Sequence, residues 1–246
     1  VKPLYYRQNG DDIWFASTPT AIARNERCDP DLEYVGRGIR LKYYEDETGI
    51  APYLGIAVMP PGHYAAIDLS AHETLAPRPY YDLDAAWRAE RPRLDSLPVG
   101  DLRTELFERL RHATMIRLRA DVPIGISLSS GVDSTTVAAL CAEADVLPLG
   151  FCFGDPDDDA SEAPRVRRFA AQLGQKVRFI PQKAGADAQR LFWRTLRAQG
   201  APFPHTSQIA QYAVFEDARA HGIKVMLGGQ GGDEAFMGYR KFFLFQ

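Results

Sequence analysis

The chain has 246 residues, 46% of them hydrophobic and 25% charged, and its formal net charge is −3 at pH 7. This composition is typical of a globular protein with a sizeable core, and the slight acidic excess argues against a nucleic-acid partner bound through a broad basic surface. The spacing of Cys28, Cys141 and Cys152 suits neither a zinc site nor a disulfide framework, which favours a reducing compartment. The uncharged residues 122–132 are too few to cross a bilayer, which takes about 20 apolar residues, and no signal peptide is visible. We therefore expect a cytoplasmic protein without a membrane partner.

The first 80 residues are predicted to be β-rich. Residues 4–6 and 13–16 flank Asn9-Gly10-Asp11, a good hairpin-turn signal. Residues 62–67 follow a Pro-Pro turn and are predicted to form a further short strand. Prolines and charges then become frequent, and we interpret residues 81–100 as a linker between two domains.

Beyond Gly100 the pattern alternates between strand and helix. Apolar periodicity predicts helices over residues 101–120, 134–144, 162–173, 188–198 and 207–220, and strands over residues 122–128, 147–153, 176–180 and 223–227. The strands lack a polar face, which is typical of a parallel sheet covered by helices on both faces. In such α/β folds ligands bind beyond the carboxyl ends of the strands.

The loop after the first of these strands runs Leu128-Ser129-Ser130-Gly131-Val132-Asp133-Ser134-Thr135. Small residues let the backbone approach a ligand, and the N-terminus of the following helix favours an anion such as phosphate. Ser129, Ser134 and Thr135 could donate hydroxyl hydrogen bonds to it. Asp133 would repel a bare phosphate, but it suits the site if Mg²⁺ bridges the two. The alternative is a plain tight turn with a helix N-cap, where Ser and Asp are favoured in any case.

A second unusual loop follows the strand predicted over residues 223–227. Its sequence is Gly228-Gly229-Gln230-Gly231-Gly232-Asp233-Glu234. Glycines lose much conformational entropy on folding, so this many of them at the carboxyl end of a strand indicate a function. Asp233 could be a second carboxylate for a metal held by Asp133. Glu234 fits either a solvated first-turn carboxylate or a catalytic one.

Together these segments resemble a known family. The loop from Ser129 to Ser134 resembles the pyrophosphate-binding loop, Ser-Gly-Gly-x-Asp-Ser, of the ATP pyrophosphatase (PP-loop) superfamily. Residues 229–234, with Gly238-Tyr239, resemble the Gly-x-Gly-x-Asp-Glu…Gly-Tyr segment of glutamine-hydrolysing asparagine synthetases. Residues 2–6 and 60–64 are similar to the closing part of that family's glutaminase domain. Because the chain also lacks an initiator Met, we expect a fragment: residues 1–80 would end a glutamine amidotransferase domain, and residues 101–246 would begin the synthetase domain.

The resemblance implies a reaction and roles for individual residues. Family members activate the aspartate side-chain carboxylate with ATP and Mg²⁺, release pyrophosphate, and amidate the β-aspartyl-AMP with ammonia drawn from glutamine. The implied nucleotide-binding residues here are Leu128, Ser129, Ser130, Gly131, Asp133, Ser134, Thr135, Phe153, Gly228 and Gly229. Asp133 and Asp233 would hold the metal. The implied catalytic residues are Gln230 and Glu234.

The sequence departs from the family pattern at three points. Ser130 replaces a glycine, which is tolerable unless the position needs a positive φ. Gln230 stands where some members carry an acidic residue, and an amide cannot act as a base, so Glu234 or a downstream residue would supply one. None of the cysteines matches the N-terminal glutaminase nucleophile, and Cys141 and Cys152 are predicted to be small core residues. The chain alone is therefore not expected to hydrolyse glutamine.

Several alternatives remain open. A carboxylate-adenylating cyclase of the β-lactam synthetase or lasso-peptide cyclase type would share both loops but use an internal amine, and a non-catalytic nucleotide-binding relative would keep the fold alone. His205 could face the substrate, whereas the acidic residues 155–159 are interpreted as a solvated loop. The expected partners are small molecules, namely aspartate, ATP and glutamine or ammonia, with a homodimer as a further possibility.

Overall fold

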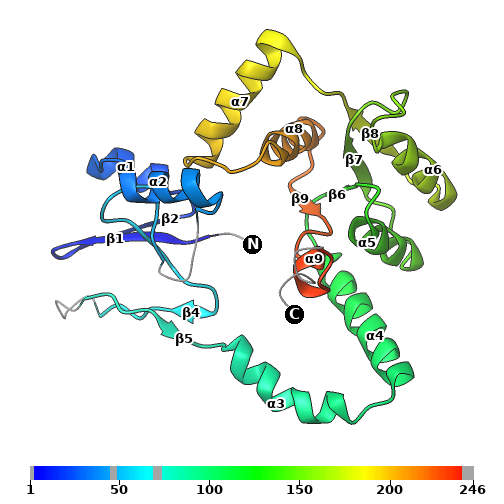
Figure 1. The fold of residues 1–246 in the computed structure, drawn as a ribbon, viewed down its shortest axis with the longest axis horizontal. Helices are drawn as coiled ribbons and strands as arrows, with labels where there is room; N and C mark the ends of the chain where they lie inside the picture. Colours follow the sequence, from blue (N-terminus) through cyan, green and yellow to red (C-terminus); the bar gives the residue numbers. More distant parts are fainter. Residues whose placement is uncertain (1–2, 45–48, 69–73, 240–246) are drawn as a thin grey trace. The chain divides into compact units, whose positions relative to one another are not determined.

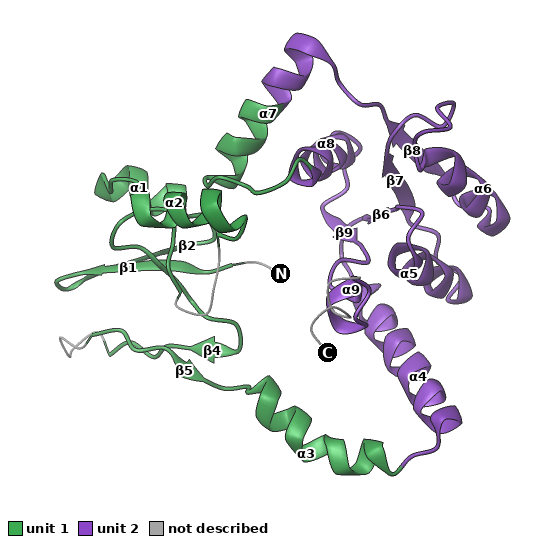
Figure 2. Cartoon of the chain, viewed as in Figure 1, with its two compact units in different colours: residues 1–96, 192–206 green, residues 97–191, 207–246 purple. Residues whose placement is uncertain are grey.

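The computed structural model describes residues 3–44, 49–68 and 74–239 (Figure 1). The chain divides into two compact units (Figure 2). The first unit comprises residues 1–96 and 192–206, and the second comprises residues 97–191 and 207–246.

The first unit contains the predicted hairpin. Strands β1 (Tyr5–Asn9) and β2 (Asp12–Ala16) pair antiparallel, and Gly10 adopts a φ of 59° in the turn between them. Strand β3 (Ala57–Val58) pairs with the other edge of β1, and β4 (His63–Tyr64) pairs with β5 (Arg78–Pro79). Helix α1 (Pro19–Glu26) contributes two buried residues to the small core of this unit, Ile22 and Ala23.

Two helices of the first unit were not predicted from the sequence. Helix α2 (Leu32–Leu41) lies within the stretch expected to be β-rich, and Asp31 caps it by accepting the N–H groups of Glu33 and Tyr34. Helix α3 (Leu83–Asp95) occupies most of the segment interpreted as a linker, so that segment is not irregular. It has no buried residue and contains Pro92, but ion pairs between side chains three and four positions apart run along it.

The second unit is an α/β fold with a parallel sheet, as predicted. Its strands are β6 (Ile124–Ser127), β7 (Leu149–Phe153), β8 (Val177–Ile180) and β9 (Val225–Leu227), in the order β8-β7-β6-β9. All three pairings are parallel. The helices are α4 (Val99–Arg117), α5 (Val132–Glu143), α6 (Ala163–Leu173), α7 (Gly185–Gln199) and α8 (Ser207–Ala220). Residues 192–199 of α7 belong to the first unit.

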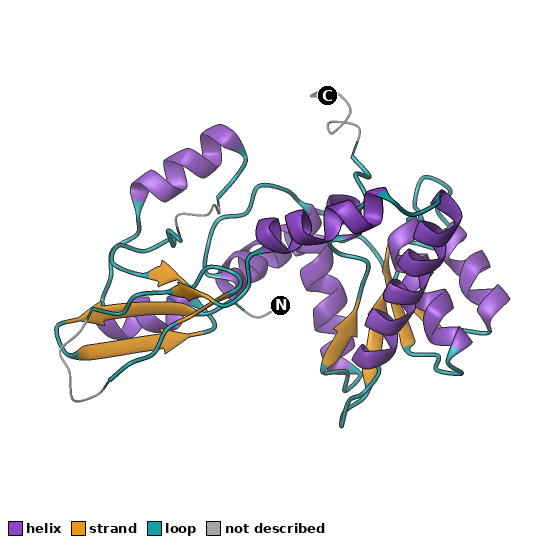
Figure 3. Ribbon diagram, turned by 90° about the horizontal axis from the view of Figure 1, so that it is seen from below, coloured by secondary structure: helices purple, strands orange, loops and turns teal. Residues whose placement is uncertain are grey.

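Helices cover both faces of this sheet (Figures 1 and 3). On one face, Ile126 and Cys152 pack with residues of α5 and α6, among them Cys141 and Val166. On the other face, Phe151 packs with residues of α7 and α8. Cys141 and Cys152 are fully buried, which confirms them as core residues, and burial raises the pKa of both thiols, that of Cys152 to about 12.

Phe151 is the largest fully buried side chain of the described residues. Phe151→Ala is expected to lower the free energy of unfolding by about 3–5 kcal/mol, because the ring leaves a cavity between the sheet and α8. Leu147→Ala, at a half-exposed position, should change it by less than about 0.5 kcal/mol. Denaturant unfolding measures both. Equal losses would show that the face of the sheet covered by α8 is not a tightly packed core.

Arg178 of β8 and Asp217 of α8 form a bidentate ion pair with N–O distances of 2.6 and 3.2 Å. The hydrogen bonds from Arg178 lower the pKa of Asp217, which therefore stabilises the folded state only while it is ionised. Asp217→Asn should cost about 1 kcal/mol at pH 7, since both side chains are partly exposed. The difference from wild type should shrink as the pH falls below about 4, through the folded-state pKa. Asp84→Asn, in an exposed pair with Arg88, is the control and should have no measurable effect. A pH-independent difference for Asp217→Asn would contradict this account.

Among the described residues, no helix has both the length and the apolar character needed to span a membrane.

Candidate functional site

The two unusual loops leave neighbouring strands at the same edge of the parallel sheet. Ile126 of β6 is paired with Leu227 of β9, so the first loop starts beside the second. From β6 the chain continues to β7 on one side, whereas β9 lies on the other side. This arrangement is a topological switch point, the position at which α/β sheets open a crevice for ligands.

The hydroxyl of Ser134 closes the first loop. It accepts the N–H of Ser129 at 3.1 Å, lies 2.9 Å from the Ser129 hydroxyl, and lies 3.0 Å from the Ser129 carbonyl oxygen. Ser134 is buried, and the Thr135 hydroxyl donates to the Gly131 carbonyl at 2.9 Å. The predicted hydroxyl donors at positions 134 and 135 thus have partners within their own loop, and a direct role toward phosphate stays a prediction.

The backbone of the first loop suits an anion. Gly131 is the N-cap residue of α5 and offers no side-chain acceptor to the N–H groups of the helix's first turn. Among the described non-glycine residues, those with a positive φ are Arg27, Lys42, Asp145 and Met237. Ser130 is not one of them, so the replacement of the family's glycine by serine introduces no backbone strain.

The second loop packs tightly against the first. A methyl group placed on Gly229 would lie 2.6 Å from both the Asp133 Cβ and the Ser134 backbone nitrogen, and one on Gly232 would overlap the Asp133 carboxylate. Gly231 has a φ of 95° and begins the short helix α9 (Gly232–Ala235). The glycines therefore allow the second loop to approach Asp133, which explains why the sequence concentrates them here.

Three carboxylates from the two loops raise the pKa of one tyrosine, Tyr239. The Tyr239 hydroxyl donates to Glu234 Oε1 at 2.8 Å, and this hydrogen bond is the largest cause of the raised pKa of Tyr239. The charges of Glu234, Asp233 and Asp133 raise it further. The Asp133 carboxylate also lies against Gly232, the residue before Asp233, so the two aspartates come together from different loops.

Asp133 and Asp233 fit the needs of Mg²⁺, which is commonly held by one or two carboxylates together with substrate phosphates and water. The described residues contain no group of three or more His, Cys, Asp or Glu side chains arranged for a metal, as an all-protein cage would require. The acidic residues 155–159 shape their own loop instead, since Asp155 and Asp158 accept the N–H groups of Asp157 and Ala160.

The remaining predicted residues of the second unit end or follow strands β6, β7 and β9. The Leu128 side chain is buried, and its N–H donates to the Phe151 carbonyl at 2.8 Å. Phe153 ends β7 and is half-buried, while Gly228 and Gln230 are exposed. His205 is exposed and belongs to the first compact unit. The roles assigned to these residues stay predictions.

Sequence reasoning missed one residue of this edge, Glu162. Its carboxylate accepts the Ser130 N–H at 2.9 Å and the Ser130 hydroxyl at 3.3 Å. Its position in the sequence could have pointed to it. Glu162 ends the loop between β7 and α6, and that loop also leaves the carboxyl edge of the sheet.

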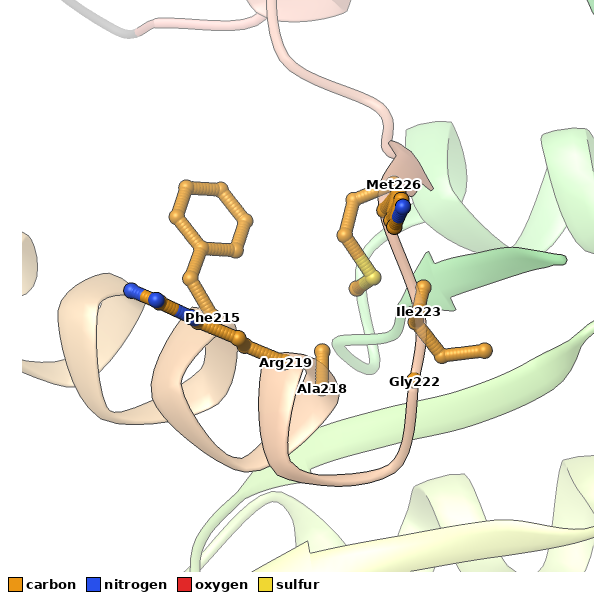
Figure 4. A pocket seen from close by; sticks show the side chains of 7 residues that line it. Phe215, Ala218, Arg219, Gly222, Ile223 and Met226 are labelled. Carbon is orange, nitrogen blue, oxygen red and sulfur yellow. The ribbon is translucent and has the colours of Figure 1, made fainter. Parts of the chain in front are cut away.

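A pocket of about 620 Å³ lies elsewhere in the second unit (Figure 4). It is formed by the C-terminal part of α8 and the segment leading into β9, with Phe215, Arg219 and Met226 among its lining residues. Since Gly222 and Ile223 precede β9 while the glycine-rich loop follows it, this pocket is at the opposite end of that strand and is separate from the candidate site.

Comparison with known proteins finds relatives among both amidases and asparagine synthetases. The chain is 31% identical to an amidase of Penicillium rubens, over 77% of this chain and 30% of that protein, and 31% identical to an amidase of Gibberella zeae, over 98% and 37%. It is 25% identical to a glutamine-hydrolysing asparagine synthetase of Bacillus subtilis, over 97% and 36%. The chain thus spans about a third of the length of these relatives. Among solved structures, an NH3-dependent NAD synthetase from Campylobacter jejuni aligns over 55% of this chain and 60% of that chain, with 15% identity and a TM-score of 0.36.

The family model described as asparagine synthase matches residues 105–246, which is more than half of the chain and includes both loops of the candidate site. The chain therefore belongs to the asparagine synthase family.

Proposed function

We propose that this chain forms the nucleotide-binding part of an ATP-dependent ligase that converts the side-chain carboxylate of aspartate to an amide. One observation carries the proposal: the glycine-rich loop after β9 packs onto Asp133 in the loop after β6, at the switch point of a parallel sheet. That arrangement brings the N-terminus of α5, which is suited to an anion, and the acidic residues of both loops to one edge.

In the proposed reaction, a carboxylate oxygen of aspartate attacks the α-phosphorus of ATP, and pyrophosphate leaves. Ammonia then attacks the carbonyl carbon of β-aspartyl-AMP, loses a proton and expels AMP, which gives asparagine. The first-loop backbone would hold the departing pyrophosphate, and Leu128, Phe153, Gly228 and Gly229 would lie near the adenosine. Such transfers depend chiefly on positioning and on stabilisation of the developing charge.

Asp133 and Asp233 would hold Mg²⁺ in the working enzyme. When bound, the ion would neutralise charge on the phosphates. Without it, the two carboxylates would repel the nucleotide, so we expect MgATP to bind far more tightly than ATP alone.

Glu234 is the better candidate for proton transfer, because Gln230 cannot act as a base. The hydrogen bond from Tyr239 orients the Glu234 carboxylate. In this proposal Gln230 serves as a hydrogen-bonding residue for the substrate or the intermediate.

Residues 1–80 are proposed to be the closing part of a glutaminase domain that supplies the ammonia. In this proposal the antiparallel sheet β2-β1-β3 belongs to that domain together with helices α1 and α2. The further proposals are a cytoplasmic enzyme with small-molecule substrates and a homodimeric assembly.

A second candidate is the same adenylation applied to another carboxylate, including ring closure by an internal amine. The observation behind it is that two relatives of 31% identity are named amidases and not asparagine synthetases, so the relatives do not agree on one acyl substrate. Both candidates need the same nucleotide site and differ only in the acyl substrate and the amine.

The deciding experiment measures pyrophosphate release from MgATP by the full-length protein. Aspartate, glutamate and other carboxylates are compared, each with glutamine, with ammonium and with neither. Release that depends on aspartate, with asparagine formed from glutamine or ammonium, is the expected result. Release with a different carboxylate supports the second candidate, and absence of carboxylate-dependent release would exclude both.

A further inference from the structure

Glu162 joins two loops at the candidate site. It is the N-cap residue of α6, yet its side chain makes no capping bond to its own helix. Its Oε2 atom instead accepts both donors of Ser130, the N–H at 2.9 Å and the hydroxyl at 3.3 Å, across 32 residues of sequence. Hydrogen bonds to an ionised carboxylate are stronger than those between neutral groups.

The backbone that carries Glu162 is well anchored. The next residue, Ala163, is fully buried in the core cluster shared by the sheet, α5 and α6. The Ser161 hydroxyl accepts the Ala163 N–H at 3.1 Å and lies where a side chain at Gly154 would stand. A side chain can hold another group in place only when its own backbone is fixed, and Glu162 meets that condition.

A carboxylate is an unexpected neighbour for an anion-binding loop, because its charge repels phosphate. The geometry resolves this conflict if Glu162 acts on the loop rather than on the ligand. Glu162 accepts the N–H of Ser130, so this donor points toward α6 and is not available to a ligand. The Gly131 N–H donates to the Ser129 hydroxyl at 3.2 Å, so the N–H groups of the first turn of α5 remain to face a ligand.

We propose that Glu162 is a positioning residue that holds the pyrophosphate loop in its binding shape through Ser130. This inference rests on the proposed function, since it assumes that the loop binds MgATP. The inference also explains the serine at position 130. A glycine there would keep the N–H hydrogen bond to Glu162 but would lose the hydroxyl hydrogen bond.

The test compares Glu162→Ala, Glu162→Gln and Ser130→Ala in the full-length protein. Glu162→Ala should weaken MgATP binding about 10-fold or more, as removal of supporting hydrogen bonds does at other sites. Glu162→Gln should recover part of that loss, because the amide oxygen can accept the Ser130 N–H. Ser130→Ala should weaken binding about 2- to 5-fold, as expected for one modest hydrogen bond. Glu143→Gln, in an exposed pair with Arg111, is the matched control and should bind normally.

Titration calorimetry gives the dissociation constants, and steady-state kinetics should show a raised KM for MgATP with the KM for the carboxylate substrate unchanged. A general structural defect would lower the melting temperature and would not select one substrate. If Glu162→Ala and Glu162→Gln bind MgATP as tightly as wild type, or more tightly, the carboxylate is a competitor of phosphate and the inference is overturned. Failure of the wild-type protein itself to bind MgATP would instead overturn the proposed function on which the inference rests.

Discussion

Asp133→Asn is expected to lower the rate of pyrophosphate release by on the order of 10²- to 10³-fold, the scale seen when one preorganised charge-stabilising group is removed. The substitution keeps the shape of the side chain beside Gly232, where there is no room for a larger group. It removes the charge that would hold Mg²⁺ on the phosphates. The loss should therefore appear in MgATP binding and in turnover, measured by calorimetry and by pyrophosphate release.

The fold should tolerate this substitution. Asp133 acts on the same tyrosine as Asp233 and Glu234, so loss of one negative charge relieves repulsion in the absence of metal. We expect the melting temperature of Asp133→Asn to be equal to or slightly above that of wild type. Asp155→Asn is the control, because its amide oxygen can still accept the Asp157 N–H. Full activity in Asp133→Asn, or equal losses in the two variants, would contradict the metal-binding role.

The second unit follows closely from its sequence because its signals are local. Runs of apolar residues mark β6 and β7, and a glycine ends α6: Gly174 adopts the left-handed conformation typical of a helix C-cap, with a φ of 68°. The proximity of the two loops was also predictable, since loops that follow parallel strands leave one edge of the sheet.

What escaped prediction depends on tertiary contacts or on weak local signals. The sequence of α3 resembles a linker because it is rich in charge and no residue of the helix is buried. Ion pairs form along the surface of this helix, but no apolar face marks it in the sequence. The bond between Glu162 and Ser130 joins residues far apart in the chain, and no periodicity reports such a contact. The hydrogen bonds by which the Ser134 hydroxyl closes its own loop also could not be read from the sequence, and its role toward phosphate stays a prediction.

Gly229→Ala is expected to have the second large effect. The added methyl group would lie 2.6 Å from the Ser134 backbone nitrogen and 2.7 Å from the Asp133 carbonyl carbon, so one of the two loops must move. Because both contacts involve backbone atoms, a change of rotamer cannot relieve them. We expect a loss of about 1–3 kcal/mol in the free energy of unfolding, typical of overpacking. Pyrophosphate release should fall by about 10²-fold or more, since small displacements of positioning groups are costly.

Two further glycine substitutions separate crowding from ligand contact. Gly100→Ala, with nothing within 4 Å of the added methyl group in helix α4, should leave activity unchanged and stability equal to or slightly above that of wild type. At Gly228 the nearest atom to an added methyl group is the Ser127 Cβ at 3.9 Å, so Gly228→Ala should keep its stability. If the nucleotide lies against this loop as proposed, Gly228→Ala should still weaken MgATP binding, because the methyl group would occupy space that the ligand needs. Normal stability and activity in Gly229→Ala would show that the two loops do not pack as closely in solution, and the observation that carries the proposed function would then be lost.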